Sequence, residues 1–182
     1  MRRVLILLAC GAALFAQNEK VRQTAGVAAA PIAVTKIPLG MLLNLEHGFD
    51  GRLISMDAAQ PIDMLGGTRG LYLPGYGTVF TTEISLIVTP GISPFRPKYT
   101  DQERARIHQQ KLAQVPKLVD LMKDLVKVTA LTLVSMPDDQ RVVYAVRLRY
   151  LAEEDTSGLP AQIVVSADKK AATQGDIKTE IE

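Results

Sequence analysis

Alternation of hydrophobic and polar residues predicts two strands in this chain. In the second half of residues 68–88, one side carries the hydrophobic residues Phe80, Ile84, Leu86 and Val88. The other side carries the polar residues Thr81, Glu83 and Ser85. Residues 141–151 alternate in the same way, with Val142, Tyr144, Val146, Leu148 and Tyr150 on the hydrophobic side. Because successive side chains of a strand point to opposite faces, both segments are predicted to bury one face.

Glycine and proline positions predict the connections between these strands. Residues 74–77 contain Gly75 and Gly77, which accept a positive φ, and they predict a hairpin turn after a strand that follows Gly66 and Gly67. Residues 136–140 predict a second turn, and residues 162–167 predict a short final strand.

A long amphipathic helix is predicted from residue 101 to about residue 133. Its hydrophobic residues recur every three or four positions, namely Val115, Leu118, Val119, Met122, Leu125 and Val126. Thr100 and Glu103 have the spacing of a capping box, in which each side chain satisfies an N–H group at the start of the helix. Pro116 is expected to kink or restart the helix, because it lacks an N–H group. A shorter helix is predicted over residues 37–45, ending near Gly48.

These elements predict a two-layer α+β fold, in which a mostly antiparallel sheet of about four strands packs on one long amphipathic helix. The predicted core joins the hydrophobic sides of the strands to the hydrophobic stripe of the helix. It consists of Phe80, Ile84, Leu86, Val142, Val146 and Leu148 under Leu118, Met122 and Leu125.

The N-terminal residues predict export. Arg2 and Arg3 precede a hydrophobic run over residues 4–15, and Ala16 and Gln17 offer a cleavage point. This run is shorter than the roughly 20 residues that span a bilayer, so residues 1–17 are predicted to be a signal peptide and the protein to be periplasmic or secreted. Residues 18–38 are predicted to be a flexible linker, 39–168 a single α+β domain, and 169–182 a polar disordered tail.

Cys10 is the only cysteine in the chain, and two interpretations of it are open. In the first, Cys10 lies in the hydrophobic part of the signal peptide and is removed with it. In the second, residues 7–10 form a lipoprotein signal, and Cys10 is lipidated after cleavage. The hydrophobic run before Cys10 is short for a lipoprotein signal and continues beyond it, which favours the first interpretation.

The balance of charge bears on the partners of the protein. The formal net charge is +2, and Arg2 and Arg3 are the only charged residues among the first 16. The remaining chain is therefore neutral, which argues against general binding to nucleic acid or to anionic membranes. No later stretch predicts a stable membrane span. An envelope protein or a peptide is the expected kind of partner, and the oligomeric state is not predicted.

The residue types needed for common catalytic and metal sites do not converge in the sequence. The two histidines, His47 and His108, lie in different contexts, and no motif for zinc, calcium or a serine nucleophile is present. The Gly75-Tyr76-Gly77 segment is followed by a strand, whereas a phosphate-binding loop leads into a helix. We therefore expect no metal, no cofactor and no identifiable catalytic set.

One face of the predicted sheet carries the candidate binding residues, which are Glu83, Arg147, Arg149, Thr81 and Ser85. These residues either form exposed cross-strand pairs of little energetic value or make up a recognition surface. The sequence thus predicts an exported bacterial protein that acts as a non-enzymatic binding or structural module of the cell envelope. The alternative is a carboxylate-dependent hydrolase with Glu83 as the base and Asp57 or Asp63 as a second carboxylate.

Overall fold

The computed structural model of the chain describes residues 36–91 and 98–182. All of the helices and strands described below lie within Val34–Glu182. The predicted signal peptide over residues 1–17, Cys10 and most of the predicted linker lie outside the described residues.

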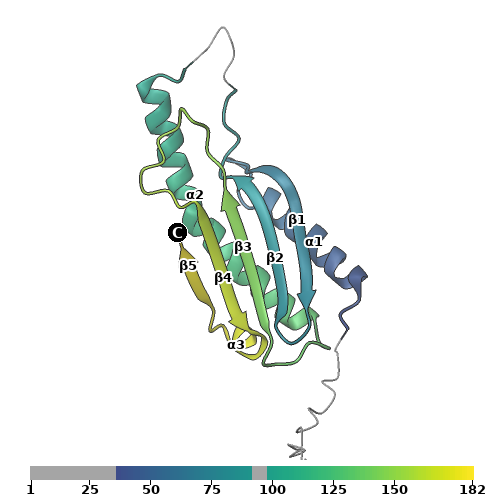
Figure 1. The fold of residues 1–182 in the computed structure, drawn as a ribbon. Helices are drawn as coiled ribbons and strands as arrows, with labels where there is room; N and C mark the ends of the chain where they lie inside the picture. Colours follow the sequence, from purple (N-terminus) through teal and green to yellow (C-terminus); the bar gives the residue numbers. More distant parts are fainter. Residues whose placement is uncertain (1–35, 92–97) are drawn as a thin grey trace, which may run out of the picture. The chain divides into compact units, whose positions relative to one another are not determined.

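Five strands and three helices follow one another along the described chain (Figure 1). Their order is α1 (Leu39–Ile54), β1 (Asp63–Leu73), β2 (Gly77–Ser85), α2 (Asp101–Thr132), β3 (Arg141–Leu148), β4 (Gln162–Asp168), α3 (Lys169–Gln174) and β5 (Lys178–Ile181). The strands form one sheet in sequential order, and only β2 and β3 are parallel. The predicted α+β class with a mostly antiparallel sheet is confirmed, with five strands in place of about four.

The parallel pair follows from the position of the long helix. Helix α2 carries the chain back along the sheet from the end of β2 to the start of β3, and such a crossover makes the two strands run in the same direction. The hairpin between β1 and β2 forms at the predicted turn, where Gly75 and Gly77 have φ values of 80° and 134°. A Cβ atom at Gly77 would lie 1.9 Å from the carbonyl oxygen of Arg141, so only glycine lets β3 approach so closely.

The hydrophobic core lies between one face of the sheet and helices α1 and α2. It unites the predicted sheet residues with the predicted helix residues in one buried cluster, including Phe80, Ile84, Val146, Leu118 and Met122. The ring of Phe49 from α1 lies 4.9 Å from that of Phe80 and 5.5 Å from that of Tyr144, measured between centroids. Val88, which we predicted on the hydrophobic side of the strand, is exposed because β2 ends at Ser85.

Helix α1 is longer than the helix predicted over residues 37–45. It continues through Gly48 and Gly51, and its buried residues Leu45, Phe49 and Leu53 recur at four-residue intervals against the sheet. Each glycine inside a helix costs about 0.5–1 kcal/mol, which is less than the burial of one such large side chain stabilises. Packing therefore overrides the local tendency of glycine to end the helix.

Helix α2 begins at the predicted capping box. The backbone N–H of Glu103 donates to Thr100 Oγ1 over 3.2 Å, and the N–H of Thr100 donates to Glu103 Oε2 over 3.0 Å. The helix continues through Pro116 without a restart. Buried residues on both sides of the proline, such as Ile107 and Leu118, hold the two halves against the rest of the protein.

The prediction of a disordered tail over residues 169–182 is wrong. The segment forms α3 and then β5, which pairs with β4 from Ile163↔Ile181 to Ser166↔Lys178. Lys169 is buried, and its ammonium donates to the carbonyl oxygens of Val134 and Met136. The polar composition was misleading, because the aliphatic part of the lysine and the backbone of the last strand supply contacts that hydropathy does not register.

Candidate functional site: the open face of the sheet

One face of the sheet has no helix over it in the described chain. Helices α1 and α2 lie behind the sheet in Figure 1, and the face in front carries the side chains that point away from the core. The strand register places these side chains in rows, one of which is Leu71, Val79, Val143 and Ser166. The next two rows are Arg69, Thr81, Ala145 and Val164, and Gly66, Glu83, Arg147 and Gln162. We call this surface the open face.

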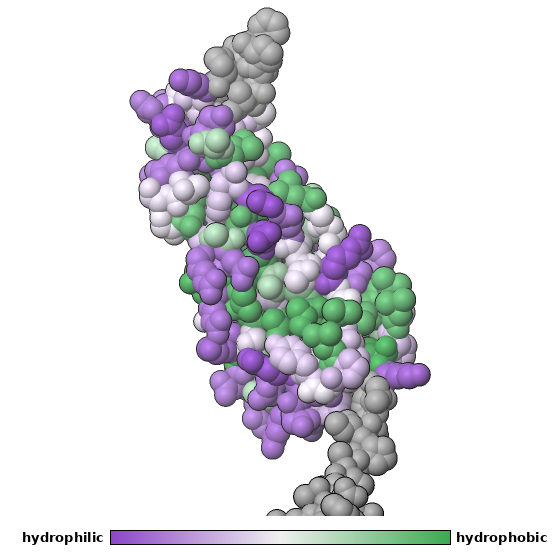
Figure 2. Space-filling model, viewed as in Figure 1, coloured by the Kyte–Doolittle hydropathy of each residue, from purple (hydrophilic) through white to green (hydrophobic). Residues whose placement is uncertain are grey.

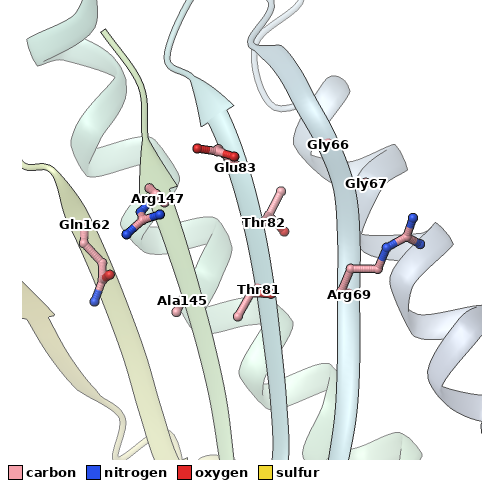
Figure 3. Close-up of a pocket in the computed structure, with 9 residues that line it drawn as sticks. All are labelled: Gly66, Gly67, Arg69, Thr81, Thr82, Glu83, Ala145, Arg147 and Gln162. Carbon is pink, nitrogen blue, oxygen red and sulfur yellow. The ribbon is translucent and has the colours of Figure 1, made fainter.

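The open face contains a hollow of about 500 Å³ (Figure 3). Small residues occupy its middle, where Thr81 lies opposite Ala145 and where Gly66 and Gly67 replace side chains on β1. Longer side chains surround this middle. The complete lining is Gly66, Gly67, Arg69, Thr81, Thr82, Glu83, Ala145, Arg147 and Gln162. The hollow therefore results from a local change in side-chain size and from irregular pairing of β1, whose register shifts on both sides of Gly66.

A chain of buried hydroxyl groups lies beneath the hollow and joins three strands to α1. Thr82 Oγ1 lies 2.8 Å from Thr68 Oγ1 and 2.9 Å from the hydroxyl of Tyr144. Thr68 in turn donates through its hydroxyl, over 2.6 Å, and through its backbone N–H, over 2.8 Å, to Asp50 Oδ1. Burial raises the pKa of Tyr144 to about 12, so its hydroxyl stays protonated and available for this network. The network holds the floor of the hollow in one arrangement.

The outer edge of β1 is closed by two carboxylates of α1. Glu46 Oε1 accepts the backbone N–H of Gly70 over 2.7 Å, in the same way that Asp50 accepts the N–H of Thr68. Edge strands with free N–H groups tend to pair with other chains. The carboxylates satisfy two of the outward N–H groups of β1, which lowers the tendency of this edge to pair with another chain.

The arginines of the open face differ in whether they have a partner. Arg149 binds the carboxylate of Glu83, Arg69 lies 3.8 Å from Glu46, and Arg141 lies 3.8 Å from Asp168. Arg147 is exposed, and it forms no hydrogen bond or ion pair with any residue in 36–91 or 98–182. The register places Arg147 directly opposite Glu83, yet the carboxylate of Glu83 is held by Arg149. Among the residues that the structure describes, the hollow therefore contains one unpaired guanidinium, that of Arg147.

Four of the five predicted binding residues lie at this site. Thr81, Glu83 and Arg147 line the hollow, and Arg149 reaches it through Glu83. Ser85 does not lie there, because its hydroxyl is buried, donates to the carbonyl oxygen of Ile87 and accepts from the ammonium of Lys111. Sequence reasoning missed Arg69, Thr82, Ala145, Gln162 and the two glycines, because only the strand order and register place them around the hollow.

Hydrophobic side chains gather on the part of the open face next to the hollow, as Figure 2 shows over the centre and lower part of the sheet. They are Leu71, Leu73, Val79 and Val164, with the largely buried Val143 among them, and we call these five residues the hydrophobic patch. Leu71 is 59% exposed and Leu73 is 40% exposed. An exposed group of this kind beside polar residues is typical of a binding surface.

The carboxylates that the hydrolase hypothesis requires are not gathered here. Glu83 is the only carboxylate among the residues that line the hollow. Asp57 instead binds Lys117 over 2.6 Å and Gln114 over 2.9 Å, and these two partners, Lys117 first, hold its pKa below the ordinary range. Asp63 lies at the first residue of β1, opposite Ser85 and outside the lining. The described residues also contain no group of three or more His, Cys, Asp or Glu side chains placed to hold a metal ion.

Comparison of the chain with protein-family models, with curated proteins and with solved structures finds no match. Among residues 36–91 and 98–182, no helix combines the length and hydrophobicity that crossing a bilayer requires. The open face and its side chains are therefore the features of the molecule that bear on its function.

Proposed function

We propose that this protein is a non-enzymatic binding module of the bacterial cell envelope that holds a protein or peptide partner on its open face. The observation that carries the proposal is the combination of exposed Leu71 and Leu73 with a hollow that contains the unpaired Arg147. Protein interfaces combine a hydrophobic centre with polar groups around it, and arginine is enriched in them. The hydroxyl network under the hollow supports the proposal further, because a rigid surface loses less entropy when it binds.

The location of the protein is part of the same proposal, and its support is the sequence of residues 1–17. We expect the exported protein to begin near Gln17 or Asn18 and to carry no lipid. The intact mass of the protein purified from the envelope tests this expectation. A mass that corresponds to a chain beginning at a diacylglycerol-modified Cys10 would replace it with the lipoprotein interpretation.

A photo-crosslinking experiment in the producing organism tests the use of the open face. One variant carries benzoylphenylalanine at Leu71, on the open face, and the control variant carries it at Leu131, on α2. The two positions are matched, because their side chains are 59% and 58% exposed. We expect a discrete cross-linked product from position 71 and none from position 131. A product from position 131 alone, or from neither position, contradicts the proposal.

A further inference from the structure

We propose that Arg147 is a carboxylate-binding residue, and that the partner on the open face is a polypeptide segment that places an Asp or Glu side chain in the hollow and its hydrophobic neighbours on the hydrophobic patch. This inference rests on the proposed binding function and names the chemistry of the partner.

The pairing of the arginines is the first reason. Three arginines around the open face are already paired with carboxylates of the chain, whereas Arg147 has no such partner in the described part of the chain. A guanidinium presents a planar set of donors that matches the two oxygens of a carboxylate. The hydroxyl of Thr81 and the amide of Gln162 line the same hollow and offer further hydrogen bonds to an anion. With Glu83 neutralised by Arg149, the remaining charge in the hollow is positive.

The distribution of carboxylates argues against a second copy of this chain as the occupant. Strand β1 has one acidic residue, Asp63, which lies at its first position, opposite Ser85 and outside the lining of the hollow. Strand β3 has none, and the acidic residues of the open face on β2, β4 and β5 are Glu83, Asp168 and Glu180. Each of these has a basic partner within its own chain, namely Arg149, Arg141 and Lys178. Two copies docked through these strands would bury Arg147 without a free carboxylate, and an uncompensated buried charge is strongly unfavourable.

The extent of the surface argues for a polypeptide and against a small organic acid. A small acid bound to Arg147 fills only the hollow between Gly66 and Gln162. It leaves Leu71 and Leu73, on the far side of the Arg69–Thr81 row, in contact with water. A segment of several residues covers both regions at once, and the hydrophobic part of its contact adds affinity in proportion to the apolar area removed from water.

Two peptide probes test the inference with the full chain. They are acetyl-Val-Thr-Glu-Val-Leu-amide and the same peptide with Gln in place of Glu, and binding is followed through the backbone amide signals in heteronuclear NMR spectra. We expect the Glu peptide to shift the signals of Thr81, Ala145 and Leu71 and to bind about tenfold more tightly than the Gln peptide, a difference of about 1.4 kcal/mol. Arg147→Gln should abolish this difference. Arg141→Gln, on the same strand and face but outside the lining of the hollow, should preserve it.

A further variant separates recognition from a structural role. Glu83→Gln removes the only carboxylate of the hollow, so the Glu peptide should bind it more tightly than it binds the wild-type protein. Because Glu83→Gln also releases the guanidinium of Arg149, the gain is assigned to Arg147 only if the double variant Glu83→Gln/Arg147→Gln lacks it.

Several results would overturn the inference. They are equal binding of the two peptides to the wild-type protein, absence of binding, or undiminished preference for the Glu peptide in Arg147→Gln. Acetate that binds as tightly as the Glu peptide would identify a small-acid site, and a dimer in sedimentation that Arg147→Gln abolishes would identify a second copy as the occupant. The proposed function has a separate test, because cross-linking from position 71 can succeed even if the partner is not acidic.

Discussion

The buried ion pair between Lys111 and Glu154 allows a quantitative prediction about stability. Lys111 comes from α2 and Glu154 from the segment between β3 and β4, and both side chains are 1% exposed. The ammonium of Lys111 also donates to Ser85 Oγ over 3.2 Å and lies 5.1 Å from the ring centroid of Tyr150. Glu154 additionally accepts from the hydroxyl of Thr89 over 3.2 Å. The pair thus joins the end of β2, helix α2 and the segment after β3.

We expect Lys111→Met to lower the free energy of unfolding by about 3–5 kcal/mol, because it leaves a buried carboxylate whose one remaining partner among residues 36–91 and 98–182 is the hydroxyl of Thr89. Total stabilities of single domains are about 5–15 kcal/mol, so this is a large fraction of the whole. The double variant Lys111→Met/Glu154→Met should be more stable than the single variant, because hydrophobic residues of similar volume can replace a buried pair at little cost. Arg52→Met is the control, since Arg52 and Asp124 form an ion pair whose side chains are 42% and 65% exposed. Arg52→Met should lower the free energy of unfolding by less than about 1 kcal/mol.

Urea denaturation of the four proteins, followed by circular dichroism, measures these differences. With an m-value of about 2 kcal/mol per molar, the midpoint of Lys111→Met should fall by about 1.5–2.5 M. The reasoning is refuted if Lys111→Met unfolds at the wild-type midpoint, which would mean that the charge on Glu154 is not buried. It is also refuted if the double variant is no more stable than Lys111→Met, since the cost of Lys111→Met would then not come from leaving Glu154 without its partner.

Three further predictions concern the core, the start of α2 and the response to acid. Phe80→Ala should lower the free energy of unfolding by about 3–5 kcal/mol, because Phe80 is fully buried against Phe49. Arg147→Ala should change it by less than about 0.5 kcal/mol. Thermal melts of the two variants show which of these two side chains lies in the core. Thr100→Ala should cost about 0.5–2 kcal/mol through loss of the capping box, and an unchanged denaturant midpoint would contradict the role of the box. The ion pair with Lys117 holds the pKa of Asp57 below its ordinary value of 3.8, so Asp57 stabilises the fold fully above that value and loses its contribution as the pH falls further. The stability of Asp57→Asn should therefore fall less steeply on acidification than that of the wild type, and denaturant midpoints between about pH 2 and pH 6 test this, with Asp63→Asn as the control.

Local sequence signals were sufficient where a residue and its immediate neighbours decide the structure. The capping box of Thr100 and Glu103 placed the start of α2, and the glycines at 75 and 77 placed the turn between β1 and β2. Local signals failed where distant contacts decide. Helix α1 continues through two glycines because Phe49 and Leu53 are buried against the sheet, and the polar C-terminal segment is ordered because β4 offers it an edge.

The candidate site shows the same division. Period-two alternation by itself determined that Thr81, Glu83 and Arg147 share the side opposite the core, because successive side chains of a strand must point in opposite directions. It could not determine that β3 lies parallel to β2, that Ala145 and the glycines of β1 leave a hollow, or that Arg149 takes the carboxylate which faces Arg147. Those features depend on which strands are neighbours and in what register, and the long-range crossover of α2 fixes that arrangement. The pattern along the chain determined the outward side of each strand, with Ser85 as the exception. Only the tertiary structure decided which outward side chains meet and that Arg147 has no partner among the described residues.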